Sequence, residues 1–482
     1  MAKNKILRGK VDKPVSPAVV RHRSREQQYA EGKAIRDSCL RESHADWKPP
    51  GDRVDPIEIL EASNKRRLPE LIPVRYGRMI PSPFVFYRGA AAIMANDLAS
   101  TPASGTVTQL CGDAHLSNFG GFATPERDLV FGLNDFDETL PGPWEWDVKR
   151  LAASMVIAGR DRGFSAKQSR KVALATAAEY RRSMREFAKL SNLELWYRRI
   201  GSADVRQRFR EEVGERGERE LDATVAKAMT KDRMRALSKL TCRVDGELRF
   251  QSNPPVLMPV EELVADRQEQ EITEFVLGVM RLYRRTLPED RRRLLDTYRY
   301  VHLARKVVGV GSVGTRAWVV LMMGVDESDP LILQVKEAQP SVLEAVLHKS
   351  EFANSGQRVV AGQRMMQTAS DIFLGWCRTP GVDGVERDFY VRQLWDWKAS
   401  ANIEAFNDSV LTAYGRLCAT TLARAHGRSG DRIAIASYLG SGDDFERAIA
   451  EFAEAYADQN EADYARITDA VASGRITAQT GI

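Results

Sequence analysis

Two acidic segments of the sequence carry the residue types that phosphoryl-transfer chemistry requires. Asp113 and Asn118 stand five positions apart in Gly-Asp-Ala-His-Leu-Ser-Asn, and Asp135 follows shortly after in Asn-Asp-Phe-Asp. This chemistry needs a group that accepts or orients the proton of the attacking hydroxyl, together with oxygen ligands for magnesium. Asp113 suits the first role, and Asn118 and Asp135 suit the second. The spacing therefore predicts a magnesium-dependent transfer site.

Neighbouring residues have roles that the sequence leaves open. Asp137 and Glu138 add carboxylates directly after Asp135. His115 lies inside the first segment, where it could support the loop or touch a substrate. His426 stands at the end of a predicted helix, and we expect it to interact with the helix C-terminus rather than to act in chemistry.

A glycine-rich segment far downstream is a candidate cradle for phosphates. Gly309, Gly311 and Gly314 form a G-x-G-x-x-G pattern that includes Ser312. Glycines let the backbone approach phosphate groups closely. Residues 315–323 are rich in β-branched and aromatic side chains, so we expect the loop to join two strands. This favours a kinase-type flap over a dinucleotide-binding turn, which runs from a strand into a helix. A plain glycine-rich hairpin is the alternative.

A lysine follows the glycine-rich segment in the third strand of the same pattern. Lys336 has apolar neighbours in the sequence LILQVKEA, and a lysine in such a strand is costly to bury unless an anion meets it. A nucleotide phosphate would be that anion, whereas a solvent-exposed strand end would need none. We expect a carboxylate on a following helix to pair with Lys336. Glu344 and Glu351 are both candidates, and the sequence does not choose between them.

The overall composition is that of a globular protein. The chain has 482 residues, of which 43% are hydrophobic and 28% charged. It contains no apolar run near the ~18 residues that a membrane-spanning helix needs. We therefore expect no membrane partner. The five scattered cysteines indicate reduced thiols, so we expect a cytoplasmic protein. A net charge of +5 gives no strong signal for nucleic acid.

The order of expected elements divides the chain into five segments. We expect a helix over 86–98, strands over 107–110, 128–133 and 388–395, a strand from Lys306, and a helix over 411–426. The segments are an arm packing on the body (1–75), the part with the first acidic loop (76–163), a charged helical insertion (164–300), a sheet with the glycine-rich loop and lysine (301–395) and a helical remainder (396–482).

The first acidic segment resembles the HGDxHxxN loop of aminoglycoside and choline phosphotransferases, which belong to the protein-kinase-like superfamily. Cys111 stands where those enzymes usually have histidine. Residues 133–152 (LNDFDETLPGPWEWDVKRLA) look like the block that follows in the same enzymes. The resemblance implies that Asp135 binds metal, that Asp147 has a structural role, and that ATP and Mg²⁺ are the cofactors.

From about Arg21 to Val471 the chain is also similar to the bacterial domain-of-unknown-function 2252 family. The similarity rests on segments such as RMIPSPFVFYRGAA, NDFDETLPGPWEWD, VGVGSVGTR and YADQNEADYA. This family brings no assigned substrate with it.

The order of the motifs differs from that of an ordinary kinase. Here the acidic motifs (113–135) precede the glycine loop and lysine (309–336) instead of following them. Because contacts depend on spatial adjacency, a circular permutation can leave a pocket intact. We therefore predict an α+β, two-lobed, protein-kinase-like fold that is circularly permuted and carries extra helices.

These features lead to several functional hypotheses. The first is an ATP- and Mg²⁺-dependent phosphotransferase acting on a hydroxyl of a small molecule or a protein. A second is transfer of a nucleotidyl (AMP) group, as in selenoprotein O-like pseudokinases. A third is a nucleotide-binding regulator without turnover, with 164–300 as its partner surface. A metal-dependent nuclease built on Asp113, Asp135 and Asp137 leaves the glycine loop and Lys336 unexplained.

Overall fold

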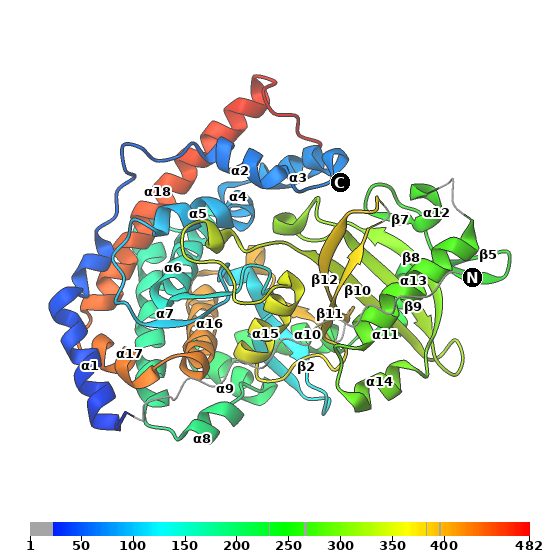
Figure 1. Ribbon diagram of the computed structural model, residues 1–482. Helices are drawn as coiled ribbons and strands as arrows, with labels where there is room; N and C mark the ends of the chain where they lie inside the picture. The colour runs from blue at the N-terminus through cyan, green and yellow to red at the C-terminus, as the bar shows by residue number, and fades with distance from the viewer. Residues whose placement is uncertain (1–22, 231, 265–267, 382, 395–396) are drawn as a thin grey trace, which may run out of the picture.

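The computed structural model describes residues 23–482 apart from 231, 265–267, 382 and 395–396. Figure 1 shows one half built mainly of helices and another built around an antiparallel sheet, which we call the helical half and the sheet half. This mixture of helices and antiparallel sheets confirms the predicted α+β class. Residues 1–22 of the expected arm, and Trp395 in the expected strand 388–395, lie outside the described residues.

The sheet half contains a six-stranded antiparallel sheet in the order β11-β12-β10-β9-β8-β7. The glycine-rich loop joins β8 to β9, as predicted, but β8 ends at Lys306, where the sequence suggested a strand beginning. The valines after Lys306 have high strand propensity, so they suggested a strand there. The strand itself is the preceding segment Arg299–Lys306, which contains several charged residues. The strands are β7 (Leu257–Pro259), β8 (Arg299–Lys306), β9 (Ala317–Met323), β10 (Pro330–Ala338), β11 (Gly375–Pro380) and β12 (Glu386–Gln393).

Strand β10 has different surroundings on its two faces. Leu331, Leu333 and Val335 pack in an apolar cluster with side chains of α13 (Glu269–Arg284). Side chains alternate along a strand, so Lys336 must point the other way. That direction faces the helical half, and it places the lysine in a cavity between the halves.

The helical half is organised around long, packed helices. α6 is buried along nearly its whole length, and α7 packs against both α6 and α16. The longest helices are α6 (Trp144–Asp161), α7 (Ala166–Phe187), α16 (Asp408–Ser429) and α18 (Asp444–Ala472). In the described part of the chain, no helix combines the length and apolar character needed to cross a membrane.

The charged segment 164–300 is divided between the two halves rather than forming one insertion. α7 is a core helix, because Val172, Tyr180 and Met184 recur on one buried face beneath its charges. β7 joins the main sheet, and β5 (Thr241–Val244) and β6 (Glu247–Phe250) form a hairpin. The other helices here are α8 (Asn192–Tyr197), α9 (Ser202–Val213), α10 (Glu215–Met229), α11 (Arg233–Leu240), α12 (Val260–Leu263) and α14 (Glu289–Leu295).

The N-terminal segment forms short helices along the helical half. The expected single helix over 86–98 is two helices, because the backbone leaves the helical conformation at Ala90, where φ is −106° and ψ is 25°. The helices are α1 (Arg25–Ser38), α2 (Pro56–Asn64), α3 (Ile72–Met79), α4 (Pro83–Gly89) and α5 (Ala91–Leu98).

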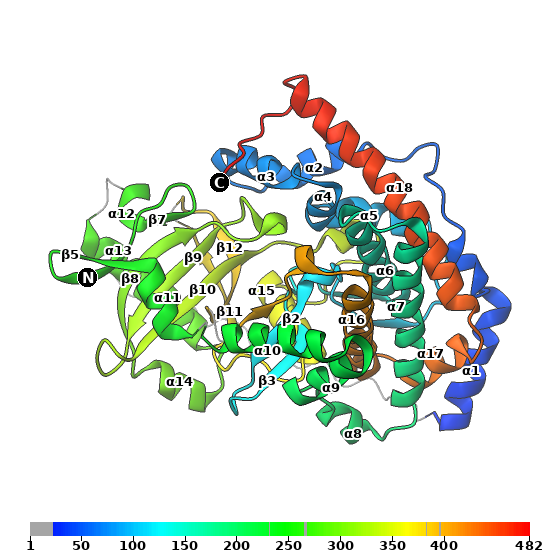
Figure 2. The ribbon, with the colours of Figure 1, turned by 180° about the vertical axis from the view of Figure 1, so that it is seen from behind.

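Short strands surround the acidic loop. The expected strands at 107–110 and 128–133 correspond to β1 (Val107–Leu110) and β3 (Leu129–Leu133). Figure 2 shows β2 beside α16 at the boundary between the halves. The pairs are β1 with β4 (Leu140–Pro143), and β2 (Phe119–Ala123) with both β3 and β13 (Ala399–Ser400).

The end of α16 lies against the start of β1, although the two are remote in sequence. The Gln109 backbone N–H donates to Ser429 Oγ at 3.1 Å. A Cβ atom added to Gly430 would lie 2.4 Å from the Thr108 side chain. The remaining helices are α15 (Ser355–Met366), which packs on β11, β12 and α16, and α17 (Arg432–Leu439).

Candidate functional site

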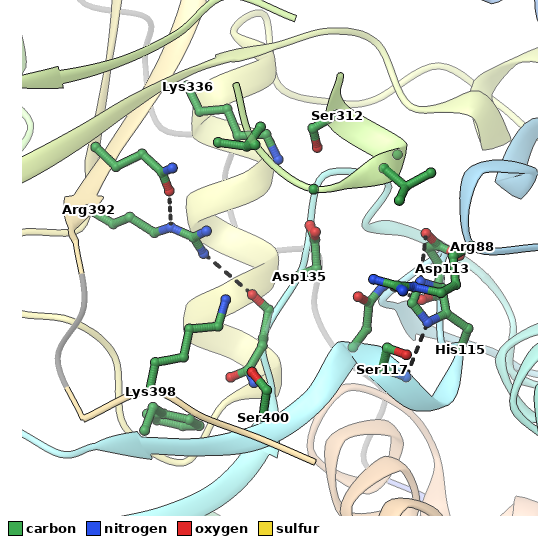
Figure 3. A pocket seen from close by; sticks show the side chains of 18 of the residues that line it. Arg88, Asp113, His115, Ser117, Asp135, Ser312, Lys336, Arg392, Lys398 and Ser400 are labelled. Atoms are coloured by element: carbon green, nitrogen blue, oxygen red, sulfur yellow. Dashed lines mark hydrogen bonds and ion pairs between the residues drawn. The ribbon is translucent and has the colours of Figure 1, made fainter. Parts of the chain in front are cut away.

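A cavity of about 770 Å³ lies between the helical half and the sheet half. Residues from both acidic segments and from the glycine-rich segment line it, as Figure 3 shows. The predicted site residues on its wall are Asp113, His115, Asn118, Asp135, Gly309, Gly311, Ser312 and Lys336. Two stretches about 200 residues apart in the chain therefore converge on one space, since Lys336 forms an ion pair with Asp137, 199 positions before it.

Helix α6 holds the acidic loop by its backbone. The Asp147 carboxylate accepts hydrogen bonds from the backbone N–H groups of Cys111 at 2.7 Å and Gly112 at 3.0 Å. Gly112 has a positive φ of +81°, and a Cβ there would lie 2.3 Å from the Glu138 carbonyl oxygen. The Cys111 side chain is fully buried. The loop is thus anchored through backbone groups, so this anchor does not depend on the side chain at position 111.

His426 supports this anchor and does not cap a helix end as expected. It is completely buried, and its Nε2 lies 3.2 Å from Asp147 Oδ2. Its Nδ1 lies 2.9 Å from the Tyr180 hydroxyl. The tertiary packing of α16 against α6 and α7 turns this histidine inward.

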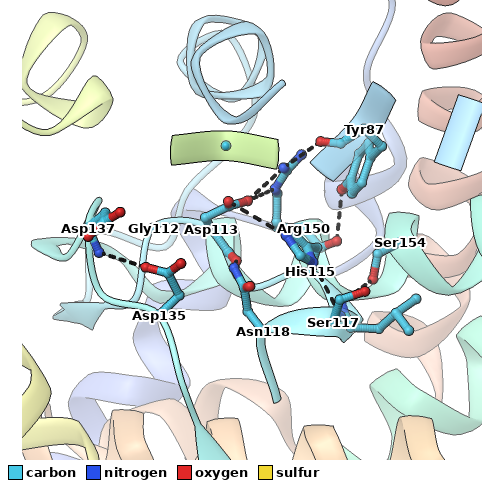
Figure 4. A network of polar contacts seen from close by, with 12 residues as sticks. Tyr87, Gly112, Asp113, His115, Ser117, Asn118, Asp135, Asp137, Arg150 and Ser154 are labelled. Carbon is cyan, nitrogen blue, oxygen red and sulfur yellow. Dashed lines mark hydrogen bonds and ion pairs between the residues drawn. The ribbon is translucent and has the colours of Figure 1, made fainter. Parts of the chain in front are cut away.

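Asp113 is held by an arginine that the sequence analysis did not identify. Arg150 donates from Nε at 2.8 Å and from Nη2 at 2.6 Å to Asp113 Oδ1, as Figure 4 shows. Arg150 also donates to the Tyr87 carbonyl oxygen at 2.8 Å and stacks on the Tyr87 ring at 3.9 Å. Burial raises the pKa of Asp113 to about 6, even though Arg150 opposes this shift. Arg150 therefore holds Asp113 through Oδ1, and Oδ2 is the Asp113 oxygen that lies toward His115.

The sequence does contain a signal for Arg150. It follows Asp147 by three positions in a helical pattern, so both side chains lie on the same face of α6. That spacing predicts that whatever Asp147 contacts is also within reach of Arg150.

His115 is buried in the loop beside Asp113. Its Nδ1 accepts the Ser117 backbone N–H at 3.2 Å, so the neutral ring carries its proton on Nε2. Nε2 lies 3.7 Å from Asp113 Oδ2. Burial, reinforced by Arg150 and Arg88, lowers the pKa of His115 well below its usual value. His115 therefore shapes the loop and also forms part of the cavity wall.

Asn118 and Asp135 present oxygen atoms to the same cavity. Asn118 Nδ2 donates to the Asp113 carbonyl oxygen at 2.8 Å, and Asp135 Oδ1 accepts the Asp137 backbone N–H at 3.2 Å. In the described part of the chain, no group of three or more His, Cys, Asp or Glu residues is placed to hold a metal. One carboxylate and one amide suit Mg²⁺, which commonly takes its remaining ligands from water and substrate phosphates.

Lys336 pairs with Asp137, and not with either expected glutamate. Lys336 Nζ donates to Asp137 Oδ2, which also accepts the Ser312 hydroxyl at 3.1 Å. The Tyr390 hydroxyl donates to Asp137 Oδ1 at 2.8 Å. Burial opposes both charges, but their mutual attraction outweighs it, so the pKa of Lys336 is raised and that of Asp137 is lowered. Asp137 thus joins the glycine-rich segment, the lysine strand and the acidic segment.

The two expected partners of Lys336 lie elsewhere. Glu344 accepts the Ser341 backbone N–H in a capping box, with Arg358 at 3.9 Å. Glu351 is exposed. The following helix, α15, carries Arg358, which donates to the carbonyl oxygens of Asp137 and Thr139. α15 therefore does not supply the carboxylate that pairs with Lys336. Its Arg358 instead holds the backbone of Asp137, the residue that does.

The N-terminal segment fastens the glycine-rich loop. The Leu68 backbone N–H donates to the Gly314 carbonyl oxygen at 2.8 Å, and Arg67 donates to those of Gly311, at 2.9 Å, and Val313. Gly314 has a φ of +89°, and a Cβ there would press on the Arg67 side chain at 3.0 Å. Gly314 therefore serves the turn, while Gly309 and Gly311 face the cavity.

Cationic side chains occupy the other end of the cavity. Arg392 donates to Gln334 Oε1 at 3.0 Å and to the Asn134 carbonyl oxygen at 3.4 Å. Figure 3 shows Arg392 with Lys398 and Ser400 on the side away from Asp113. The sequence did not identify Arg392 or Lys398 as candidate site residues, because neither lies within a recognisable motif.

A family model described as an uncharacterised protein conserved in bacteria (DUF2252) matches residues 67–470. The chain belongs to this family, as its sequence similarity suggested. Neither curated proteins nor solved structures gave a match.

Proposed function

We propose that this protein is an ATP- and Mg²⁺-dependent phosphotransferase with a circularly permuted, kinase-like arrangement, acting on a hydroxyl of a small molecule or a protein. One observation carries the proposal: the glycine-rich loop, Lys336 and the acidic residues Asp113 and Asp135 line the same cavity. Phosphoryl transfer needs a lysine and a glycine-rich backbone to bind the phosphates, and oxygen ligands for magnesium, all around one cavity.

The junction between α16 and β1 supports the permutation. Along the chain, β8, the glycine loop, β9, β10 with Lys336, α15, β11, β12 and α16 follow one another in an ordinary kinase-like order. The end of α16 meets β1, which leads directly into the acidic loop. A chain connected there would read glycine loop, lysine, helix and acidic loop, as kinases do.

The residues have distinct roles in this proposal. Lys336, Ser312 and the backbone of the glycine loop bind the phosphates, and this requires Lys336 to exchange Asp137 for a phosphate oxygen. Asn118 and Asp135 would hold Mg²⁺, which would neutralise charge on the bound phosphates. Asp113, through Oδ2, orients the acceptor hydroxyl and takes its proton.

The transfer forms a bond between the acceptor oxygen and the γ-phosphorus. The bond from that phosphorus to the β,γ-bridging oxygen breaks, and ADP leaves with the electron pair. The acceptor proton passes to Asp113, and Arg150 keeps this carboxylate oriented throughout.

The proposal is tested by incubating the protein with γ-labelled ATP, Mg²⁺ and a metabolite pool, and analysing products by mass spectrometry. We expect transfer that falls about a hundredfold or more in Asp113→Asn and in Lys336→Met. Lys349→Met, which changes an exposed lysine, is the matched control.

Other outcomes identify the competing functions. Products that gain adenylate indicate nucleotidyl transfer, the alternative use of the same cavity. Thermal stabilisation by ATP, abolished by Lys336→Met but without any product, indicates a nucleotide-binding regulator. Absence of both binding and turnover contradicts all three.

A further inference from the structure

Arg88 is a cationic residue in the cavity that has no role in the function proposed above. It lies in α4, within the motif Phe-Tyr-Arg-Gly, and it lines the same cavity as Asp113 and Lys336. Figure 3 shows its side chain beside Asp113 and His115, on the side of Asp135 away from Arg392 and Lys398. Arg88 is therefore at the end of the cavity where the acceptor hydroxyl would meet Asp113.

The Arg88 guanidinium is poorly satisfied by the protein itself. Its Nε is buried and has no hydrogen-bond partner among the described residues. Burial lowers its pKa, and Asp113 and Glu404 only partly offset this. Asp113 Oδ1 is already occupied by Arg150, so Arg88 does not share that ion pair. A half-buried cation without a direct carboxylate partner is costly unless a ligand supplies the anion.

The cavity wall carries two further cationic side chains on this side of the glycine loop, Arg78 and Lys306. Arg78 donates to the Val308 carbonyl oxygen at 2.7 Å and to the Ile482 main-chain oxygen at 3.2 Å. Lys306 also lines the cavity, and burial together with Arg78 and Lys239 lowers its pKa. These cations line the same cavity as Arg88 and the glycine loop, so the cavity is suited to an anion.

We propose that Arg88 binds an anionic group, a phosphate or a carboxylate, on the acceptor whose hydroxyl meets Asp113. The inference rests on the proposed phosphotransferase function and narrows its acceptor to hydroxyl compounds that carry such a group. The planar guanidinium offers paired N–H donors that match two oxygens of a phosphate or carboxylate. A neutral polyol or a cationic amino sugar would leave Arg88 without a counter-charge.

The nucleotide already has its own set of groups. Lys336, Ser312 and the glycine loop surround Asp137, and they are placed to bind the triphosphate. Arg88 belongs to α4, which packs against the glycine loop, and its side chain lies beside Asp113 and His115 in Figure 3. The carboxylates whose charges act on Arg88 are Asp113 and Glu404, whereas Asp137 acts on Lys336. The position beside Asp113 therefore assigns Arg88 to the acceptor.

The test measures anion binding with the nucleotide site filled. The protein is first saturated with Mg²⁺ and a non-hydrolysable ATP analogue, and inorganic phosphate and acetate are then titrated separately by calorimetry. We expect at least one of these anions to bind, and Arg88→Met to weaken it about tenfold or more. Arg88→Lys should retain part of the affinity. Arg66→Met, which changes an exposed arginine outside the cavity wall, should leave it unchanged.

The two anions distinguish a phosphate-bearing acceptor from a carboxylate-bearing one. The inference is overturned if neither anion binds the saturated protein, or if Arg88→Met binds the anion as well as the parent protein does. It is also overturned if Arg88→Met weakens the ATP analogue as strongly as the anion, because Arg88 would then belong to the nucleotide site. Thermal unfolding of both Arg88 variants shows whether they fold.

Failure of the proposed function gives a different result. If the protein transfers no phosphate but binds nucleotide, the titrations above apply unchanged; if it binds no nucleotide, the ATP analogue does not bind the parent protein at all. Titrating the nucleotide-free parent, Arg88→Met and Lys336→Met proteins then still decides the anion site: loss of binding in Arg88→Met alone supports it, and equal binding in the parent and Arg88→Met proteins refutes it.

Discussion

Two ion pairs, one in each half of the molecule, differ in how far their charges are buried. In the helical half, Asp147 and His426 are paired with almost no exposed surface, at 2% and 0% of their side chains. In the sheet half, Arg243 and Glu327 form an ion pair with side chains that are 54% and 60% exposed. Apolar clusters support both halves, around the long helices of one and on both faces of the central strands of the other.

This difference separates two ways of positioning a functional loop. The acidic loop depends on desolvated charges fixed by core helices, which are strong but intolerant of change. The glycine-rich loop depends on hydrogen bonds from a half-buried segment near the surface, which can open more easily. We expect the first loop to be rigid and the second to respond to ligands.

The largest effect is expected for the buried anchor of the acidic loop. Asp147→Asn removes a charge and turns an amide N–H₂ toward the backbone N–H groups of Cys111 or Gly112 or toward His426. We expect about 3 kcal/mol of lost unfolding free energy, together with loss of phosphoryl transfer. Guanidinium denaturation and the transfer assay measure these. A stability loss below about 1 kcal/mol would contradict the strong coupling that we assign to this half.

Acid sensitivity should also originate in the helical half. His44 is fully buried against the Tyr438 hydroxyl, and burial, reinforced by Lys149, lowers its pKa to about 3. Below pH 6.5 the unfolded chain binds a proton that the folded chain excludes, so stability falls as the pH falls from 6.5 toward 3. From pH 7 to pH 5 this amounts to about 2 kcal/mol for this residue.

The matched variant for this prediction is His44→Gln, which keeps a polar group near Tyr438 but does not titrate. Denaturation at pH 5 and pH 7 should show a smaller difference for the variant than for the parent protein. Equal pH dependence in the two proteins would show that His44 does not contribute, and that other groups account for the acid sensitivity.

A smaller and more local effect is expected at the glycine-rich loop. Arg67→Ala removes the side-chain hydrogen bonds to Gly311 and Val313 but keeps the Leu68 contact. We expect about 1 kcal/mol of lost stability and faster hydrogen exchange over 309–315, with the exchange of residues 111–118 unchanged. Equal acceleration in both segments would mean that the two loops are not held independently.

The smallest effect is expected at the exposed pair of the sheet half. Arg243→Ala should change the unfolding free energy by about 0.5 kcal/mol or less, because solvent screens both charges. Urea denaturation at low and high salt measures this. A change comparable with that of Asp147→Asn would remove the contrast between the halves.

Local sequence patterns predicted much of the fold around the site. The strands expected over 107–110 and 128–133 and the helix expected over 411–426 correspond to β1, β3 and α16, and the glycine pattern lies between two strands as expected. These elements follow from periodicity, which neighbouring residues determine. The charged stretch 164–300 was harder to interpret, because α7 hides a buried face beneath its charges. The helix expected over 86–98 breaks at Ala90, where the backbone leaves the helical conformation despite the helix-favouring alanines that follow.

The sequence by itself determined which residue types are available for chemistry: the acidic pair with its asparagine, the glycines and a lysine in an apolar strand. Only the tertiary structure decided that Lys336 meets Asp137 rather than Glu344 or Glu351, and that Arg150 holds Asp113. The reason is physical. A buried charge takes the partner that packing brings to it, and packing between segments about 200 residues apart leaves no trace in local spacing.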